Sequence, residues 1–132
     1  RPSHGFLAKP EEGMLNFDLE KSNAHSDVAN NSKTAYKYKF DGILDMGITQ
    51  EQVFDQVAKP VIEDVLQGIN GTIFAYGQSG SGKTFTITGG DQRYADRGLI
   101  PRTIAYIFDE FAKRKDCKHS MMISYLEIYN ND

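Results

Sequence analysis

The chain has 132 residues, 39% of them hydrophobic and 25% charged, which is the range of ordinary globular proteins and allows at most one domain. Fifteen basic against 18 acidic residues leave a formal charge of −3, which excludes a surface that binds duplex nucleic acid through bulk positive charge. The single Cys117 excludes an internal disulfide and favours the cytosol or nucleus, and apolar runs fall short of the roughly 20 residues of a membrane span.

The first third of the chain predicts two strands. Residues 14–19, "MLNFDL", alternate partly between apolar and polar, and "AYKYKFD" at 35–41 alternates cleanly, with Tyr36, Tyr38 and Phe40 on one face. The Asn-rich and Ser-rich residues 20–33 between them predict an exposed loop. Because the chain opens on "RPSH" and stops at "YNND" directly after a strand-like segment, we interpret it as a fragment.

From Thr49 the apolar period becomes that of a helix, with Thr49 as N-cap and Gln52 placed to complete a capping box. Pro60 predicts a kink or a break near Lys59, and Gly68 predicts the C-terminal stop. Two adjacent i, i+4 rows are expected to form one buried face: Val53, Val57, Val61 and Val65, and Phe54, Ala58, Ile62 and Leu66.

Two apolar runs predict buried strands of a parallel sheet: "TIFAY" at 72–76 and "SMMISYLEIY" at 120–129. Between them an amphipathic helix is expected to begin near Pro101. Its apolar stripe consists of Ile100, Ile104, Ile107, Phe108 and Phe111. The order helix, strand, glycine loop, helix, strand predicts an α/β sandwich.

The stretch "GQSGSGKT" satisfies the pattern G-x-x-x-x-G-K-[ST] of a phosphate-binding loop. Gly77, Gly80 and Gly82 allow backbone conformations in which successive amides turn inward around a polyphosphate, and the helix expected after the loop adds its free donors. Lys83 is expected to reach the β- and γ-phosphate oxygens, and the Thr84 hydroxyl to ligate Mg²⁺. A flexible linker explains the glycines but neither their spacing nor the apolar run before them.

The loop indicates a nucleoside triphosphate without saying which one. A second acidic motif at the end of an apolar strand is missing, because Asp45 follows only "GIL" and Asp109 lies on the predicted helix. The guanine-reading N-K-x-D is absent too, which weighs weakly against a GTPase. From the residues alone, an ATPase, a kinase and a GTPase stay open.

Other chemically active side chains have ordinary interpretations. His4, His25 and His119 lack ligand spacing, and Cys117 fills a connection between helix and strand. A solvated helix C-terminus is preferred to a contact with an acidic partner for the basic group Lys113, Arg114, Lys115 and Lys118. Buried strand positions are preferred to a base-stacking platform for Tyr125 and Tyr129. The charged loop with Asp91, Arg93, Tyr94, Asp96 and Arg97 is either a gate at the nucleotide or an exposed turn.

"NGTIFAYGQSGSGKTFTITGG" closely resembles the phosphate loop of the kinesin motor domain with its flanks. "TQEQVFDQVAKPVIEDVLQGING", "RGLIPRTIAYIFDEF" and "ISYLEIYN" resemble the helix before this loop, the helix after it and the following strand. "VANNSKTAYKYKF" and "GGDQRYADRGLIPRT" are most similar to the ninth kinesin family, associated with cilia and flagella. The resemblance implies a truncated motor domain: a P-loop NTPase three-layer sandwich with a central, mostly parallel sheet.

The resemblance implies a microtubule-stimulated ATPase that moves along microtubules. ATP and Mg²⁺ would be its cofactors, tubulin its partner, the cytoplasm, cytoskeleton and ciliary axoneme its location, and homodimerisation a property of regions outside this chain. Neither nucleic-acid binding nor a membrane span is expected. Lys83 would be catalytic, Thr84 the Mg²⁺ ligand, and the nucleotide would be bound by Gly77, Gln78, Ser79, Gly80, Ser81, Gly82, Lys83, Thr84 and Phe85.

Some positions are assigned by the resemblance alone. Ser79 replaces the threonine usual in the family, and Phe85 falls where an aromatic or imidazole ring lies near adenine. The Arg1-Pro2 pair is a candidate for the end of the adenine clamp, and residues 89–98 correspond to an insertion near the nucleotide.

Residues 1–132 would be the partial, nucleotide-binding N-terminal half of the motor domain, without the switch regions and the main microtubule-binding regions. We therefore expect these 132 residues alone to be unable to turn over ATP. The alternative is a nucleotide-regulated, non-motile microtubule-binding or scaffold protein with the same fold.

Overall fold

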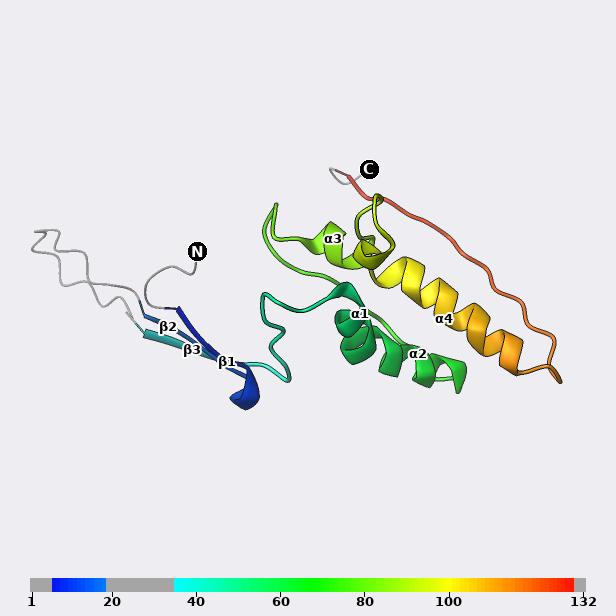
Figure 1. Cartoon of the computed structure of the whole chain (residues 1–132), viewed down its shortest axis with the longest axis horizontal. Helices are drawn as coiled ribbons and strands as arrows, with labels where there is room; N and C mark the ends of the chain where they lie inside the picture. The colour runs from blue at the N-terminus through cyan, green and yellow to red at the C-terminus, as the bar shows by residue number, and fades with distance from the viewer. Residues whose placement is uncertain (1–5, 19–34, 130–132) are drawn as a thin grey trace, which may run out of the picture. The chain divides into compact units, whose positions relative to one another are not determined.

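The computed structural model describes residues 6–18 and 35–129. Its contacts divide the chain into two units, Arg1–Ile48 and Thr49–Asp132, which are described separately (Figure 1). The Arg1-Pro2 pair and the loop predicted at 20–33 lie outside the described residues. Within the described ranges, none of the helices has the length and apolar character needed to cross a membrane.

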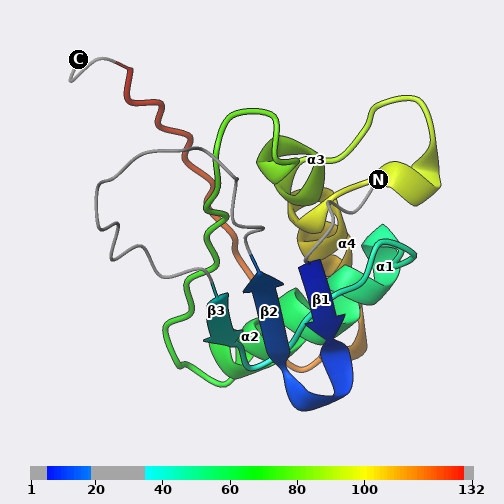
Figure 2. The same ribbon diagram turned by 90° about the vertical axis from the view of Figure 1, so that its left-hand side faces the viewer.

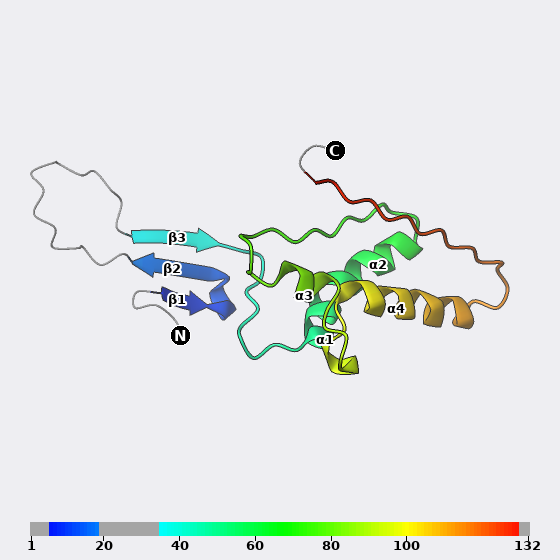
Figure 3. The same ribbon diagram turned by 90° about the horizontal axis from the view of Figure 1, so that it is seen from above.

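The first unit contains a three-stranded antiparallel sheet of order β1-β2-β3, formed by β1 (Phe6–Lys9), β2 (Met14–Asp18) and β3 (Ala35–Lys39) (Figures 2 and 3). The strands predicted at 14–19 and 35–41 are confirmed with shorter bounds, whereas β1 was not predicted. A 3-10 turn, η1 (Pro10–Glu12), joins β1 to β2 and ends at Gly13 with φ 62°. The Gly13 carbonyl accepts from the Phe40 amide at 2.8 Å, which leaves no room for a side chain there.

The register of this sheet places aromatic and aliphatic side chains on one face. Phe17 pairs with Phe6 on one side and with Tyr36 on the other, and Leu15 pairs with Ala8 and Tyr38. The Tyr36 and Tyr38 rings stack with centroids 6.4 Å apart. The predicted common face of Tyr36 and Tyr38 is therefore confirmed.

The second unit is helical in its regular parts (Figure 1). Its elements are α1 (Gln50–Val53), the π-helix η2 (Phe54–Ala58), α2 (Lys59–Leu66), α3 (Lys83–Ile87), the 3-10 turn η3 (Tyr94–Asp96) and α4 (Leu99–Lys113). The capping box is confirmed, because the Gln52 amide donates to Thr49 Oγ1 at 3.2 Å and the Thr49 amide donates to Gln52 Oε1 at 2.9 Å.

The break predicted near Lys59 takes the form of the π-helical turn η2, after which α2 begins at Lys59. Pro60 lies in the first turn of α2, where a missing backbone donor costs little. Gly68, with φ 95°, ends this helix as predicted. Its amide donates to Val65 O and the Ile69 amide donates to Asp64 O, both at 3.0 Å, which is a Schellman arrangement.

The core of the second unit consists of Phe54, Ala58, Ile62 and Leu99. Only one of the two predicted rows on residues 53–66 is therefore central to it. In the other row the prediction is wrong for Val57 and Val65, which are substantially exposed, whereas Val53 packs against the core. In the π-helical turn i→i+5 hydrogen bonds replace i→i+4 ones, so the two rows do not stay aligned. Gly71 passes over the partly exposed row, to which Val61 belongs. A Cβ on Gly71 would lie 2.5 Å from a Val61 methyl group.

Helix α4 begins at Leu99, two residues before Pro101, and the apolar stripe predicted on it is partly wrong. Ile100 and Phe108 are half exposed, whereas Tyr106 and Ile107 pack on the core. The Tyr106 ring meets Phe54 edge on, with centroids 5.9 Å apart at 62°. Helix α4 thus presents Leu99 and Tyr106 to the buried row of η2 and α2.

The strands predicted at 72–76 and 120–129 are not formed. Both segments run as irregular chain, and within the described residues neither pairs with another strand. Phe74 is 81% exposed and Tyr76 94%, while Ile73 packs on the core, so residues 72–76 keep the alternation of a strand. A strand is defined by hydrogen bonds to a neighbour, which an apolar run alone does not supply.

Candidate functional site

Residues 77–82 form a tight loop between the extended segment 72–76 and α3. Gly80 and Gly82 have φ angles of 77° and 94°, in the left-handed region that favours glycine. A Cβ at position 77 would lie 2.6 Å from Ser81 Oγ, so the loop closes on Gly77 as well. Helix α3 starts at Lys83, as expected.

Lys83 lies inside this loop. Its ammonium donates to the Gly77 carbonyl at 2.8 Å and to the Gln78 carbonyl at 2.7 Å. An ammonium group has three N–H donors, so one of them is left for a further acceptor. The loop therefore holds a positive charge at its centre, with a donor available to an anion.

Most backbone amides of the loop are not used inside the protein. The Ser81 amide donates to the Gln78 carbonyl at 3.2 Å. Among the residues that the structure describes, none accepts a hydrogen bond from the amides of Ser79, Gly80, Gly82, Lys83 and Thr84. Such a run of free donors around an ammonium is suited to an anion with several oxygens, such as a polyphosphate.

Thr84 and Phe85 follow on α3, and both side chains are exposed. The Thr84 hydroxyl is thus accessible as an oxygen ligand for a hard cation, and Mg²⁺ commonly takes few protein ligands together with phosphate oxygens and water. A Cβ built on Gly90 would lie 3.7 Å from the Phe85 ring, which places Gly90 close to that ring. Within the described residues, His, Cys, Asp and Glu side chains do not gather into a metal-binding group.

Gln50 was missed by the sequence analysis. Its amide nitrogen donates to the Phe85 carbonyl at 2.7 Å, and the side chain belongs to a residue that is only 8% exposed. A polar residue at the start of a helix is ordinarily predicted to face solvent. The sequence therefore does not indicate that Gln50 contacts Phe85, 35 positions further along the chain.

Residues 89–98 form a loop closed at its neck. Gly98 donates to the Thr88 carbonyl at 3.1 Å, and Gly90 to the Asp96 carbonyl at 2.9 Å. Arg93 binds both carboxylate oxygens of Asp96, at 2.7 and 3.2 Å. Arg102 on α4 donates to the carbonyls of Arg97 and Ala95. These hydrogen bonds hold a segment whose residues 91–95 are exposed, as expected for an exposed turn, and a gating role at the nucleotide stays a prediction.

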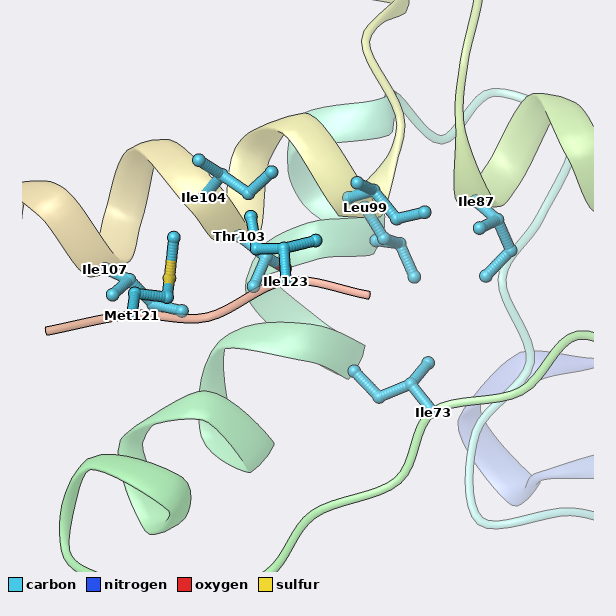
Figure 4. Close-up of a pocket in the computed structure, with 9 residues that line it drawn as sticks. Ile73, Ile87, Leu99, Thr103, Ile104, Ile107, Met121 and Ile123 are labelled. Atoms are coloured by element: carbon cyan, nitrogen blue, oxygen red, sulfur yellow. The ribbon is translucent and has the colours of Figure 1, made fainter. Parts of the chain in front are cut away.

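An apolar pocket of about 410 Å³ lies beside α4 (Figure 4). The side chain of Thr103 provides the single hydroxyl group of the lining. The other lining residues are apolar: Ile73, Ile87, Leu99, Ile100, Ile104, Ile107, Met121 and Ile123. Residues from both predicted strands, 72–76 and 120–129, thus meet the same side of α4. The lining is typical of an incompletely filled core and does not suit a charged ligand.

The remaining side chains singled out from the sequence have local roles. The His119 ring stacks on Phe111 at 4.3 Å, and Cys117 is exposed. The helix end is basic as predicted, with Lys113 and Arg114 near Glu110 at 2.6 and 3.8 Å. Tyr125 is 88% exposed, so its prediction as a buried position is wrong, as is that for Tyr129. The reason is the missing strand pairing of residues 120–129.

Neither carboxylate considered as a second acidic motif forms one here. Asp45 accepts from the Met46 amide at 2.7 Å and from Ile48 through its carbonyl, so it is a turn residue. Asp109 is an exposed residue of α4.

Comparison with known proteins agrees with the kinesin resemblance. The family profile of the kinesin motor domain matches residues 7–132. The chain is 48% identical over 126 residues to kinesin-like protein KLP1 of Chlamydomonas reinhardtii, covering 96% of this chain and 16% of that protein. It is 37% identical over 136 residues to kinesin-like protein KIF9 of Mus musculus, covering 100% and 17%. For KIF9 of Homo sapiens the identity is 40% over 110 residues, covering 83% and 14%.

These matches show that the chain belongs to the kinesin motor domain family. Members of this family are α/β proteins with a phosphate-binding loop. The relatives named KIF9 agree with the resemblance to the ninth kinesin family. The chain spans 14% to 17% of the length of these relatives.

Proposed function

We propose that residues 77–85 bind the triphosphate of ATP with Mg²⁺ in a microtubule motor. The observation that carries this proposal is the loop itself, in which the Lys83 ammonium is held by two carbonyls while most of the loop amides have no acceptor among the described residues. Free amides and an ammonium around one space are the donors that a polyphosphate requires.

The residues of the loop have separate tasks in this proposal. Gly77, Gly80 and Gly82 keep the backbone close enough for its amides to contact phosphate oxygens. Lys83 stabilises the charge that develops on the phosphates during hydrolysis, and Thr84 supplies a hydroxyl ligand for Mg²⁺. Bound Mg²⁺ would neutralise phosphate charge. Gln78, Ser79 and Ser81 line the loop, and the exposed Phe85 ring provides a surface for adenine.

Residues 72–76 and 120–129 run as unpaired chain in this structure, and we propose that in the full-length protein they pair as strands of the central, mostly parallel sheet of a three-layer sandwich. Two observations support this. Ile73, Met121 and Ile123 line the same pocket beside α4, and residues 72–76 alternate between inward and exposed side chains (Figure 4). The inward side chains would fill the layer between the sheet and α4.

The whole protein is proposed to couple ATP hydrolysis to movement along microtubules, as a cytoskeletal protein that functions in cilia or flagella and dimerises through other regions. Membership of the kinesin family supports the motor activity, and the KIF9 relatives support the ciliary assignment through the ninth-family resemblance. In this proposal residues 1–132 are part of the motor domain, and catalysis requires residues beyond them.

The test is an ATPase assay of the full-length protein with and without microtubules. Stimulated turnover and gliding of microtubules are the expected results. Nucleotide binding without stimulated turnover would overturn the motor and leave a nucleotide-regulated scaffold. The nucleotide is tested by competition: the ATP assignment fails when GTP displaces a labelled ATP analogue as well as ATP does.

A further inference from the structure

We infer that Gln50 is a positioning residue for the phosphate loop, acting through the Phe85 carbonyl on α3. This inference rests on the proposed nucleotide binding at residues 77–85. Gln50 is the first residue of α1, and its amide nitrogen lies 2.7 Å from the Phe85 carbonyl oxygen. Only the amide nitrogen of glutamine can donate to a carbonyl, so the contact also fixes the orientation of the amide.

Helix α3 needs tertiary contacts to keep its position. It has five residues, far fewer than an isolated helix requires for stability in water. At its far end, Ile87 packs against the core and the Thr88 carbonyl accepts from Gly98 at 3.1 Å. Phe85 is the middle residue of α3, so the Gln50 contact holds the helix between the phosphate loop and the anchored end.

The Phe85 carbonyl is available to Gln50 because the helical ladder ends one residue earlier. The amides of Thr88 and Gly89 both donate to the Thr84 carbonyl, at 2.8 and 3.1 Å. A regular ladder would have directed the Gly89 amide to Phe85 instead. Gln50 therefore supplies the donor for a carbonyl at the end of a short helix.

Gln50 is itself held rigidly. The capping box between Thr49 and Gln52 fixes the turn of α1 that carries it. Helix α1 also contacts η3, so the first turn of α1 lies against residues that follow the loop as well as against α3. A buried amide on a fixed helix turn can restrain a neighbouring backbone, whereas an exposed and mobile one cannot.

The consequence is a defined position for Lys83 and Thr84, which lie two residues and one residue before Phe85 on the same helix. When the Gln50 donor is removed, α3 is free to shift at the end that meets the phosphates. Losing one such hydrogen bond corresponds to nucleotide binding that is about threefold to tenfold weaker.

The experiment compares three variants of the full-length protein by equilibrium titration with MgATP at neutral pH. Gln50→Leu removes the donor, and Gln50→Glu keeps the shape but places a carboxylate against the carbonyl. Glu51→Gln is the matched control, because it changes an exposed side chain of the same helix and leaves both the capping box and α3 untouched. We expect both Gln50 variants to bind MgATP about threefold to tenfold more weakly, and Glu51→Gln to stay within about twofold of the parent.

Circular dichroism melting identifies variants that do not fold. If Gln50→Leu unfolds, Gln50→Glu decides, because its carboxyl group regains a donor when protonated and its binding should approach that of the parent as the pH is lowered. Parent-like binding by the folded Gln50 variants, or equal weakening by Glu51→Gln, would overturn the inference alone. A parent protein that does not bind MgATP would overturn the proposed function, and the inference with it.

Discussion

The Lys83 ammonium and the Gly77 carbonyl lie 2.8 Å apart, at opposite ends of the glycine loop. This hydrogen bond, together with the one to Gln78, closes the backbone around the charge that the loop is proposed to present to phosphate. The same contact makes Lys83 important both for the shape of the loop and for its charge.

Replacing Lys83 with Met should abolish nucleotide turnover in the full-length protein. The variant loses the charge and both carbonyl contacts, and removal of one such stabilising group typically costs about a hundredfold or more in rate. The measurement is steady-state ATP hydrolysis with microtubules. Lys115→Met removes an exposed lysine beyond the end of α4 and should keep the parental rate. Parental turnover by Lys83→Met would contradict the proposed role.

Gly89→Ala should destabilise the second unit. Gly89 has φ 88°, and a Cβ there would overlap the backbone of Gly98 and Asp96, neither of which can move aside cheaply. A strained left-handed residue costs about 1 to 3 kcal/mol before the overlap is counted. Gly47→Ala is the control, because a Cβ at that position meets nothing within 4 Å. Urea unfolding of both variants gives the comparison, and equal midpoints would show that the neck tolerates a side chain.

Thr49→Ala should lower the free energy of unfolding by about 1 kcal/mol. It removes the hydroxyl that accepts from the Gln52 amide at 3.2 Å at the start of α1. Thr49→Ser keeps the hydroxyl and should unfold close to the parent in urea. If both variants lose the same stability, the methyl group and not the cap is responsible.

Tyr106 should ionise at a higher pH than a free tyrosine in an alkaline absorbance titration. Burial, the 3.0 Å hydrogen bond to Glu63 and the negative charge of Glu63 raise the pKa of Tyr106 above its usual value. Glu63→Gln keeps an acceptor without the charge and should move this ionisation part of the way back. If the component with the raised pKa persists in Tyr106→Phe, the assignment is wrong.

The raised pKa of Tyr106 also fixes the sign of a stability effect. Because the folded protein favours the protonated phenol, its contribution is complete below the pKa of the unfolded chain and is lost as the pH rises through the folded pKa. Tyr106→Phe should therefore cost about 1 kcal/mol at neutral pH and progressively less in strong alkali, measured by urea unfolding.

Features determined by neighbours in sequence were predictable. The capping box at Thr49, the stop at Gly68 and the start of α3 at Lys83 each depend on side chains and backbone within a few residues. The phosphate loop was predictable for the same reason, since its glycines and Lys83 act within one short segment. Interactions between residues close together in the chain can thus be predicted from a single sequence.

Features that depend on distant partners were not predictable. Residues 72–76 have the composition of a buried strand. A strand also needs a partner segment to pair with, and composition does not show which segment that is. The Gln50 contact with Phe85 joins residues 35 positions apart. The π-helical turn, which exposes Val57, follows from how the helix packs and not from an apolar period.

Because the loop is closed at Gly89 and Gly98, the positions of α3 and α4 do not depend on how many residues lie between these two glycines. Since backbone contacts at these two glycines already join the end of α3 to the start of α4, residues added or removed at the exposed positions near Tyr94 need not shift either helix. This segment is thus a natural place to insert a reporter peptide or a fluorophore attachment site in the protein.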